Sequence, residues 1–185
     1  EGRLNITAVI LAGGRSSRMG TSKALLSNGG LYQIDRTRQI LSELKPFVRR
    51  VVVSGAVPGT DFIPDLEPFS GPVGGVASAA KACLVDSSDG LLVVPVDLPL
   101  LTSASLVPLL SYFTENEPSA ICFEGEWLPA IFRLNENLIV QCGRNGSIHG
   151  LLKRLSFVTL PSPDRRALAN ANTPEDWAQL TGSHL

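Results

Sequence analysis

Three short apolar runs, each followed by a segment with helical character, constrain the fold of this chain more than any other feature of its sequence. The runs lie at residues 6–12, 51–53 and 91–96. They consist mostly of Val, Ile, Leu and Ala without polar alternation, which is typical of strands buried on both faces. The helical segments lie at residues 31–44, 73–85 and 103–113. Because strands that alternate with helices are joined by right-handed crossovers, the sequence predicts a parallel sheet with helices on both faces.

The second half of the chain is less regular and predicts a mixed end to this sheet. Strands are expected at residues 120–124, 128–134 and 157–160, and helices at 136–142, 147–155 and 173–180. Thr173 is expected to cap the final helix, with Pro174 in its first turn. The sequence shows no repeat, low-complexity tract or linker. Residues 1–185 are therefore expected to form a single α/β domain, three-layered and Rossmann-like, with a mainly parallel sheet.

The charge balance and the cysteine content exclude several kinds of partner and site. The 16 Lys and Arg residues oppose 17 Asp and Glu residues, and this net charge of −1 gives no global attraction to nucleic acid or anionic membrane. The three cysteines are widely separated and there are two histidines, so neither a disulfide framework nor a zinc site is expected. No apolar stretch approaches the roughly 18 to 20 residues that span a bilayer, and residues 1–5 do not resemble a signal peptide. We therefore expect a cytoplasmic protein that binds neither nucleic acid nor membrane.

The segment from Leu11 to Lys23 has the composition of a polyphosphate-binding loop. It follows the first expected strand directly and contains three glycines, several hydroxyl side chains and three cations. Glycine lets backbone N–H groups approach an anion closely, and Arg and Lys offset the charge of a triphosphate. The glycine spacing matches neither the GxxxxGK[ST] pattern of a P-loop nor the GxGxxG pattern of dinucleotide-binding folds. The alternative interpretation is a solvated Gly/Ser turn.

Asp97 directly follows the third apolar run and is expected at the carboxyl end of a central strand, beside the glycine-rich loop. A carboxylate at this edge can hold Mg²⁺, a hard cation that uses one or two carboxylates together with phosphate oxygens and water. Taken alone, Asp97 is as readily a turn residue or a helix cap. Because Asp97 and the glycine-rich loop are expected at the same edge of the sheet, we favour the interpretation of Asp97 as a metal ligand.

Three further features carry weaker signals. Asp65 and the Gly-rich residues 70–75 lie between the second strand and its helix, where they could contact a sugar or base, or form a plain entry to the helix. Asn170 and Asn172 share one side of an extended segment, since alternate residues lie on the same face, although this segment is also a helix start. His149 has no neighbouring Cys or His and is expected to be structural or at the surface.

The sequence has no visible Ser/His/Asp or Cys/His combination for covalent catalysis. A reaction whose nucleophile is already ionised needs no such combination of side chains. Transfer of a nucleotidyl group from a nucleoside triphosphate to a phosphate monoester is such a reaction, because its barrier is largely charge repulsion and alignment. Mg²⁺ and two or three cations would lower that barrier.

Four segments together resemble the molybdenum cofactor guanylyltransferases (the MobA family) of the nucleotidyltransferase superfamily. They are Leu11-Ala12-Gly13-Gly14 with Arg18-Met19-Gly20 and Lys23, Gly71-Pro72 with Gly74-Gly75, Asp97 with Pro99, and Asn170-Ala171-Asn172-Thr173-Pro174-Glu175-Asp176. They occur in the order of the family and span nearly the whole chain. The first and third segments are shared with many nucleotidyltransferases that act on sugar phosphates and terpenoid precursors. The last is more specific to the guanylyltransferase branch. The resemblance implies the nucleotide-diphospho-sugar transferase fold.

The resemblance also implies a role for each matching residue. The nucleotide, GTP, would be bound by Leu11, Ala12, Gly13, Gly14, Lys23, Asp65 and Asp97. The implied catalytic residues are Lys23, Arg18 and Asp97, of which Asp97 would also hold Mg²⁺. Asn170 and Asn172 would bind the acceptor.

The implied reaction joins GMP from GTP to the terminal phosphate of molybdopterin bearing molybdenum and releases pyrophosphate. Other proteins of cofactor biosynthesis and molybdoenzyme acceptors are implied as partners. One departure is Ser54-Gly55, which stands where the family often has Asn after the second strand. The alternatives therefore stay open: a cytidylyl- or other nucleotidyltransferase acting on molybdopterin or a sugar phosphate, or a non-catalytic nucleotide-binding domain.

Overall fold

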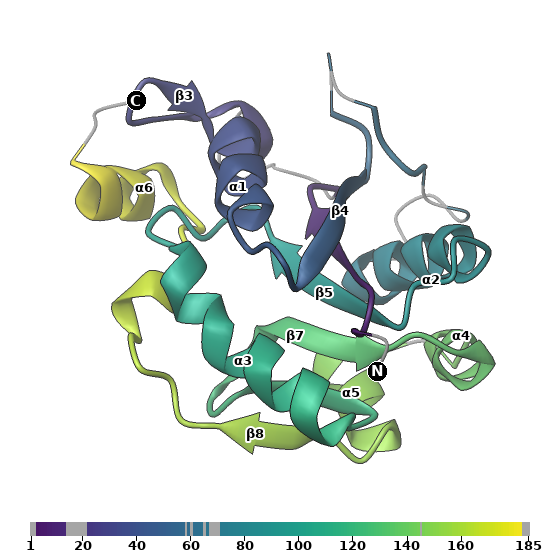
Figure 1. Cartoon of the computed structure of the whole chain (residues 1–185). Coiled ribbons are helices and arrows are strands. Elements are labelled where there is room, and N and C mark those ends of the chain that lie inside the picture. Colours follow the sequence, from purple (N-terminus) through teal and green to yellow (C-terminus); the bar gives the residue numbers. More distant parts are fainter. Residues whose placement is uncertain are drawn as a thin grey trace.

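The chain folds around one large mixed sheet (Figure 1). A computed structural model describes residues 3–13, 22–57, 59, 61–64, 66, 71–144 and 146–182. Within these residues, six strands pair in the order β4-β1-β5-β7-β6-β8. Their bounds are β1 Ile6–Leu11, β4 Val48–Ser54, β5 Gly90–Pro95, β6 Ala120–Phe123, β7 Glu126–Arg133 and β8 Val158–Leu160. The predicted α/β class and the mixed end of the sheet are confirmed.

The first three strands of the chain that enter this sheet are parallel, and their carboxyl ends meet at one edge. Leu11 lies opposite Ser54 on β4 and Pro95 on β5. Strand β7 is antiparallel to both β5 and β6, while β8 runs parallel to β6. A parallel α/β sheet binds its ligands outside the carboxyl ends of its strands, so the edge near Leu11, Ser54 and Pro95 is the place for a site.

Helices cover both faces of the sheet. The helices are α1 Gln33–Ser42, α2 Gly71–Leu84, α3 Ser103–Asn116, α4 Glu136–Cys142, α5 Ile148–Arg154 and α6 Pro174–Thr181. Residues of α1 and α3 share one hydrophobic cluster with the sheet, and residues of α2, α4 and α5 share a second cluster on the opposite face. The three predicted layers are therefore present (Figure 1).

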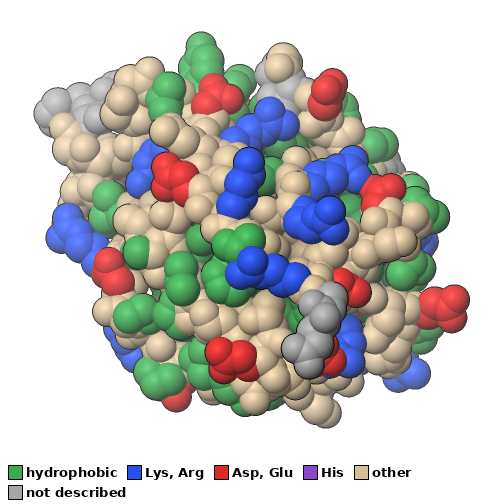
Figure 2. All heavy atoms as spheres, viewed as in Figure 1, with side chains coloured by type: hydrophobic (Ala, Val, Ile, Leu, Met, Phe, Trp, Pro, Cys, Tyr) green, Lys and Arg blue, Asp and Glu red, His purple; other side chains and the backbone are tan. Residues whose placement is uncertain are grey.

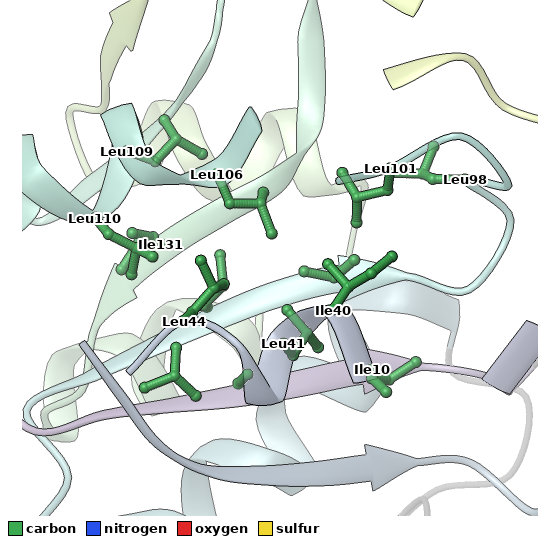
Figure 3. Packing of buried hydrophobic residues seen from close by; sticks show 14 of the residues in the cluster. Ile10, Ile40, Leu41, Leu44, Leu98, Leu101, Leu106, Leu109, Leu110 and Ile131 are labelled. Atoms are coloured by element: carbon green, nitrogen blue, oxygen red, sulfur yellow. The ribbon is translucent and has the colours of Figure 1, made fainter. Parts of the chain in front are cut away.

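The two-sided cover explains why β1 carries no polar alternation. Ala8 and Ile10 belong to the cluster with α1 and α3, whereas Val9 between them belongs to the cluster with α2, and all three are fully buried. Figure 3 shows the first cluster from close by, where Leu41 of α1 and Leu106 of α3 lie over the same face of the sheet. Burial of such aliphatic side chains stabilises the fold by roughly 1.5–3 kcal/mol for each side chain.

The start of the first predicted helix is wrong. Leu31 and Tyr32 form the short strand β3, Leu31–Tyr32, which pairs with β2, Ser27–Asn28, in a separate hairpin. The turn of this hairpin is Gly29-Gly30, and both glycines have positive φ. Leu31 and Tyr32 are 44% and 56% exposed. They match the apolar pattern of the predicted helix, but they do not pack on the core.

The second predicted strand is longer than the sequence indicates, since β4 begins at Val48 rather than Val51. Arg49 and Arg50 are both exposed at the start of this edge strand, where the register with β1 shifts, so two consecutive charged residues concealed the start of the strand in the sequence. The predicted capping of the final helix is confirmed: the Thr173 hydroxyl accepts a hydrogen bond from the N–H of Asp176, and Pro174 begins the helix. The described residues include no helix of sufficient length and hydrophobicity to cross a membrane.

Candidate active site

Asp97 lies just beyond the carboxyl end of β5, at the edge where the parallel strands end. Its Oδ2 atom is 3.3 Å from the Nζ of Lys23, the first residue of the short 3-10 helix η1, Lys23–Leu25. The two side chains are 16% and 21% exposed, so the ion pair is largely but not fully removed from solvent. Two residues that the sequence assigned to nucleotide binding thus lie together.

Asn170 and Asn172 complete this cluster from the other end of the chain. The Nδ2 of Asn170 donates to Oδ1 of Asp97 at 3.2 Å, and the Nζ of Lys23 donates to Oδ1 of Asn172 at 3.3 Å. Ala171 between them is fully buried, and its N–H donates to the main-chain oxygen of Asp97 at 3.0 Å. The prediction that both amides share one face is confirmed. We call Lys23, Asp97, Asn170 and Asn172 the polar cluster.

A small hydrophobic cluster holds two parts of the polar cluster together. Leu26 follows η1, Ala171 lies between the two asparagines, and Trp177 comes from α6. Trp177 is fully buried, and its indole Nε1 donates to the main-chain oxygen of Ser27 at 3.2 Å. The segments that carry Lys23 and Asn172 are therefore fastened to each other by packing as well as by hydrogen bonds.

The loop that carries Asp97 is held by a buried amide that sequence reasoning missed. Gln33, at the start of α1, is fully buried, and its Nε2 donates to the main-chain oxygens of Val96 at 3.0 Å and Leu98 at 3.3 Å. Its Oε1 accepts a hydrogen bond from Nδ2 of Asn28 at 3.0 Å. The same Nδ2 also donates to the main-chain oxygen of Pro99 at 2.9 Å. A Gln between a strand and an amphipathic helix gives no sequence signal, because nothing local distinguishes it from an exposed polar residue.

The described start of the glycine-rich loop lies against the end of β4. The N–H of Ala12 donates to the oxygen of Ser54 at 2.9 Å, and the oxygen of Leu11 accepts from the N–H of Val96 at 3.1 Å. Gly55 has φ +99°, and a Cβ built on it would lie 2.4 Å from the N of Gly13. Gly55 is thus required by both its backbone conformation and the close approach of Gly13.

Ser54 does not present its hydroxyl to the site edge. The side chain is buried, and Oγ donates to the main-chain oxygen of Gly75 in α2 at 3.2 Å. The helix predicted at residues 73–85 begins earlier, because α2 starts at Gly71, so the Gly-rich residues 71–75 form its first turns rather than a loop before it. Gly14, Arg18 and Asp65, which the sequence assigned to the nucleotide site, lie outside the described residues.

His149 makes an aromatic contact rather than a polar one. Its ring stacks on that of Trp127, with centroids 3.9 Å apart and an angle of 7° between the planes. Phe157 approaches the Trp127 ring edge-on at 6.1 Å. This agrees with the structural role expected for His149.

The oxygen atoms of the polar cluster suit a hard cation. The Lys23 ammonium lies within 3.3 Å of one carboxylate oxygen and of one amide oxygen, those of Asp97 and Asn172. Among the described residues no group of three or more His, Cys, Asp or Glu side chains gathers as a complete metal site. Mg²⁺ needs no such group, since it is held by one or two carboxylates together with phosphate oxygens and water.

Solved structures of nucleotidyltransferases share this architecture. The crystal structure of molybdopterin-guanine dinucleotide biosynthesis protein A from Archaeoglobus fulgidus matches with a TM-score of 0.76 and 20% identity, covering 95% of this chain and 97% of that one. The structure of 4-diphosphocytidyl-2C-methyl-D-erythritol synthase matches with a TM-score of 0.72 and 14% identity, covering 98% of each chain. The fold is therefore the α/β fold of the nucleotidyltransferases.

Sequence comparison defines the family within this class. The family model described as MobA-like NTP transferase domain matches residues 8–156. A protein named molybdenum cofactor guanylyltransferase from Xanthomonas euvesicatoria pv. vesicatoria (strain 85-10) is 36% identical, over 94% of this chain and 93% of that protein. A protein of the same name from Shewanella baltica (strain OS185) is 31% identical, over 95% of each. The chain belongs to the MobA-like NTP transferase family.

Proposed function

We propose that this chain is a molybdenum cofactor guanylyltransferase, which transfers GMP from GTP to molybdenum-loaded molybdopterin. The observation that carries the proposal is the polar cluster, which joins Lys23 and Asp97 to the two asparagines at the carboxyl ends of the parallel strands. Relatives named for this activity align with nearly the whole chain, including both ends of the cluster.

In this reaction an oxygen of the acceptor's terminal phosphate forms a bond to the α-phosphorus of GTP. The bond from that phosphorus to the oxygen bridging to the β-phosphate breaks, and pyrophosphate leaves with the electron pair. The attacking oxygen is already ionised at neutral pH, so no side chain has to remove a proton. The site must instead align two anions and offset their repulsion.

Different residues of the site would bind the nucleotide and the acceptor. Lys23 would place its ammonium on the phosphates of GTP, where Arg18 would assist, and the backbone from Leu11 to Gly14 would line the nucleotide. Asp65 would lie near the nucleoside. Asn170 and Asn172, which belong to the opposite end of the chain, would hold the acceptor through their amides.

Asp97 would hold Mg²⁺, because its carboxylate is the kind of oxygen ligand that this cation uses and lies beside the Lys23 ammonium at the proposed phosphate position. When bound, the ion would withdraw charge from the phosphate oxygens. The charge of Lys23 and the hydrogen bond from Asn170 would keep the Asp97 carboxylate oriented for it.

The test is direct. The purified chain is incubated with Mg²⁺, molybdenum-loaded molybdopterin and one nucleoside triphosphate at a time, and the pterin product is identified by chromatography. A guanine dinucleotide formed only with GTP supports the proposal. A cytidine dinucleotide would overturn the choice of base, and absence of product with every triphosphate would favour another phosphate acceptor or a binding-only domain.

Other proteins of cofactor biosynthesis and molybdoenzymes that take up the product are proposed as partners. They follow from the chemistry of the product, which is useful only when it reaches another protein. A cytoplasmic setting stays a prediction from the cysteine content, and the three cysteines are free thiols buried in the fold.

A further inference from the structure

A basic groove lies far from the polar cluster, at the amino-terminal end of the edge strand β4. Its lining residues are Arg38, Ser42, Lys45, Val48, Arg49, Arg50 and Val51, and they enclose about 400 Å³. Four of these residues are cations and none is acidic. In Figure 2 Lys and Arg side chains gather on the face formed by α1 and β4. A chain with a net charge of −1 thus concentrates positive charge at one place.

Most of these cations have no acidic partner. Arg50 forms an ion pair with Asp86, but Arg38, Lys45 and Arg49 form no salt bridge within the described part of the chain. The Nε of Arg38 is buried and lacks a hydrogen-bond partner among those residues. The carboxylate of Glu43 accepts a hydrogen bond from Ser103 of α3 at 3.1 Å and forms no salt bridge with these cations among the described residues.

The groove also contains an open backbone edge. At the far end of β4, the edge is covered by Ile63, whose N–H donates to the oxygen of Val53 at 2.7 Å and whose oxygen accepts from Gly55 at 3.1 Å. Val51 and Val53 alternate along the regular part of the strand, so their main-chain groups point to the same side, whereas the register with β1 shifts at Arg49. On that side the main chain of Val51 forms no backbone hydrogen bond with a loop residue that the structure describes.

We propose that the groove binds an extended acidic segment of a partner protein, which adds as a strand to β4 and places its carboxylates against Arg38, Lys45 and Arg49. Strand addition supplies main-chain hydrogen bonds, and charge complementarity supplies selectivity. A phosphate or nucleotide would meet the charges but would leave the open main-chain groups of the edge strand at Val51 unused. Cations on an edge strand also discourage self-pairing, but that role requires no groove lined from two elements.

The position of the groove separates docking from nucleotide chemistry. The polar cluster is at the carboxyl ends of the parallel strands, whereas Arg49 lies near the start of β4, at the opposite end of the sheet. A partner bound at the groove would leave the nucleotide edge accessible.

The test titrates the ¹⁵N-labelled chain with a short peptide of alternating Glu and Thr and follows the amide resonances. The expected result is a set of shifts confined to α1, Lys45 and the first half of β4, weakened when NaCl is raised to about 0.5 M. The double variant Lys45→Ala/Arg49→Ala should bind about tenfold more weakly. The matched variant Arg144→Ala/Lys153→Ala, which removes two exposed cations elsewhere, should bind as the parent does.

Two further probes make the outcome decisive. A peptide N-methylated at both Glu and Thr cannot donate along either edge and should lose most of its binding if strand addition is correct. Equal binding of that peptide, equal competition by inorganic phosphate or by an oligonucleotide, or absence of shifts at β4 would each overturn the proposal.

Discussion

The Nζ of Lys23 lies 3.3 Å from Oδ2 of Asp97, although 74 residues separate them in the chain. Each residue is carried by a short segment just beyond the sheet, and neither segment is held by the ion pair alone. Gln33 holds the Asp97 loop, and Trp177 holds the segment that follows Lys23. The geometry of the site therefore depends on residues that would touch no substrate.

Replacing Asp97 with Asn should lower the rate of nucleotide transfer by about a hundred- to thousandfold. The change removes the charge that faces Lys23 and the proposed metal ligand, but it keeps the size of the side chain. Initial rates with GTP and loaded molybdopterin measure the effect, and Glu115→Gln, which removes an exposed carboxylate on α3, is the control. A D97N enzyme with parental turnover would refute the role of Asp97.

Replacing either Asn170 or Asn172 with Ala should raise the KM for the pterin by about tenfold, with a smaller effect on the KM for GTP. Both amides belong to the polar cluster, and each contributes one hydrogen bond to the ion pair. Steady-state kinetics with each substrate varied in turn separates the two constants. The exposed Asn137→Ala on α4 is the control, and a larger effect on GTP would assign these residues to the nucleotide.

Replacing Gln33 with Leu should lower both stability and activity. The variant leaves the oxygens of Val96 and Leu98 without a side-chain donor inside the protein, at a cost of about 1–3 kcal/mol in the free energy of unfolding. Displacement of the Asp97 loop should also reduce kcat, by up to about a hundredfold. Urea unfolding and turnover are measured in parallel with Gln39→Leu, an exposed position on the same helix. If kcat is retained while stability falls, Gln33 serves the core rather than the site.

Replacing Gly55 with Ala should be more harmful than the same change at Gly59. Both glycines have positive φ, so each Ala variant is strained by about 1–2 kcal/mol. At Gly55 the new Cβ would also meet the backbone of Gly13, whereas at Gly59 it would meet no atom of the described residues within 4 Å. Thermal unfolding should show a larger loss for Gly55→Ala, together with a raised KM for GTP. Similar losses for both variants would mean that the contact with Gly13 is unimportant.

The buried thiols should make the fold sensitive to alkaline pH. Burial raises the pKa of Cys122 and of Cys142 to about 11, above their ordinary value of 9.0. The contribution of these thiols to stability is complete below pH 9.0 and is lost as pH rises toward 11, because the unfolded chain releases its thiol protons first. The free energy of unfolding should fall across this window, and less steeply in Cys122→Ala/Cys142→Ala. An identical slope in that variant would assign the loss to other groups.

The same thiols should react slowly with iodoacetamide in the folded protein, since the thiolate is the reactive form and burial disfavours it. Labelling below pH 9.0, followed by mass spectrometry, should become rapid only after denaturant is added.

Sequence patterns predicted the parts of this fold whose burial is uniform. The run that became β1 is covered on both faces, so its composition alone identified it, and the strong cap at Thr173 located α6. The patterns failed where the exposure of a side chain does not match its polarity. Leu31 and Tyr32 are apolar but exposed in a hairpin, and Arg49 and Arg50 are charged but belong to a strand.

The candidate site was predicted to a similar extent. Lys23 and Asp97 could be selected because their residue types suit the chemistry and they follow expected strands. Asn170 and Asn172 were selected through the resemblance to the family, since on their own they indicate only a helix start. Gln33 could not be selected, because its importance comes from carbonyl groups more than 60 residues away that only the tertiary fold brings to it.

Every strand of the described sheet ends by Leu160, whereas both asparagines of the polar cluster come later in the chain. A chain that stops at Leu160 would contain the whole sheet and both partners of the Lys23 and Asp97 ion pair, yet neither amide and no Trp177. The sheet and the polar cluster therefore depend on different parts of the chain. We expect a chain cut after Leu160 to retain the sheet but to lack a complete polar cluster, because the last segment reaches the site through the packing of Trp177 on Leu26 and its hydrogen bond to Ser27.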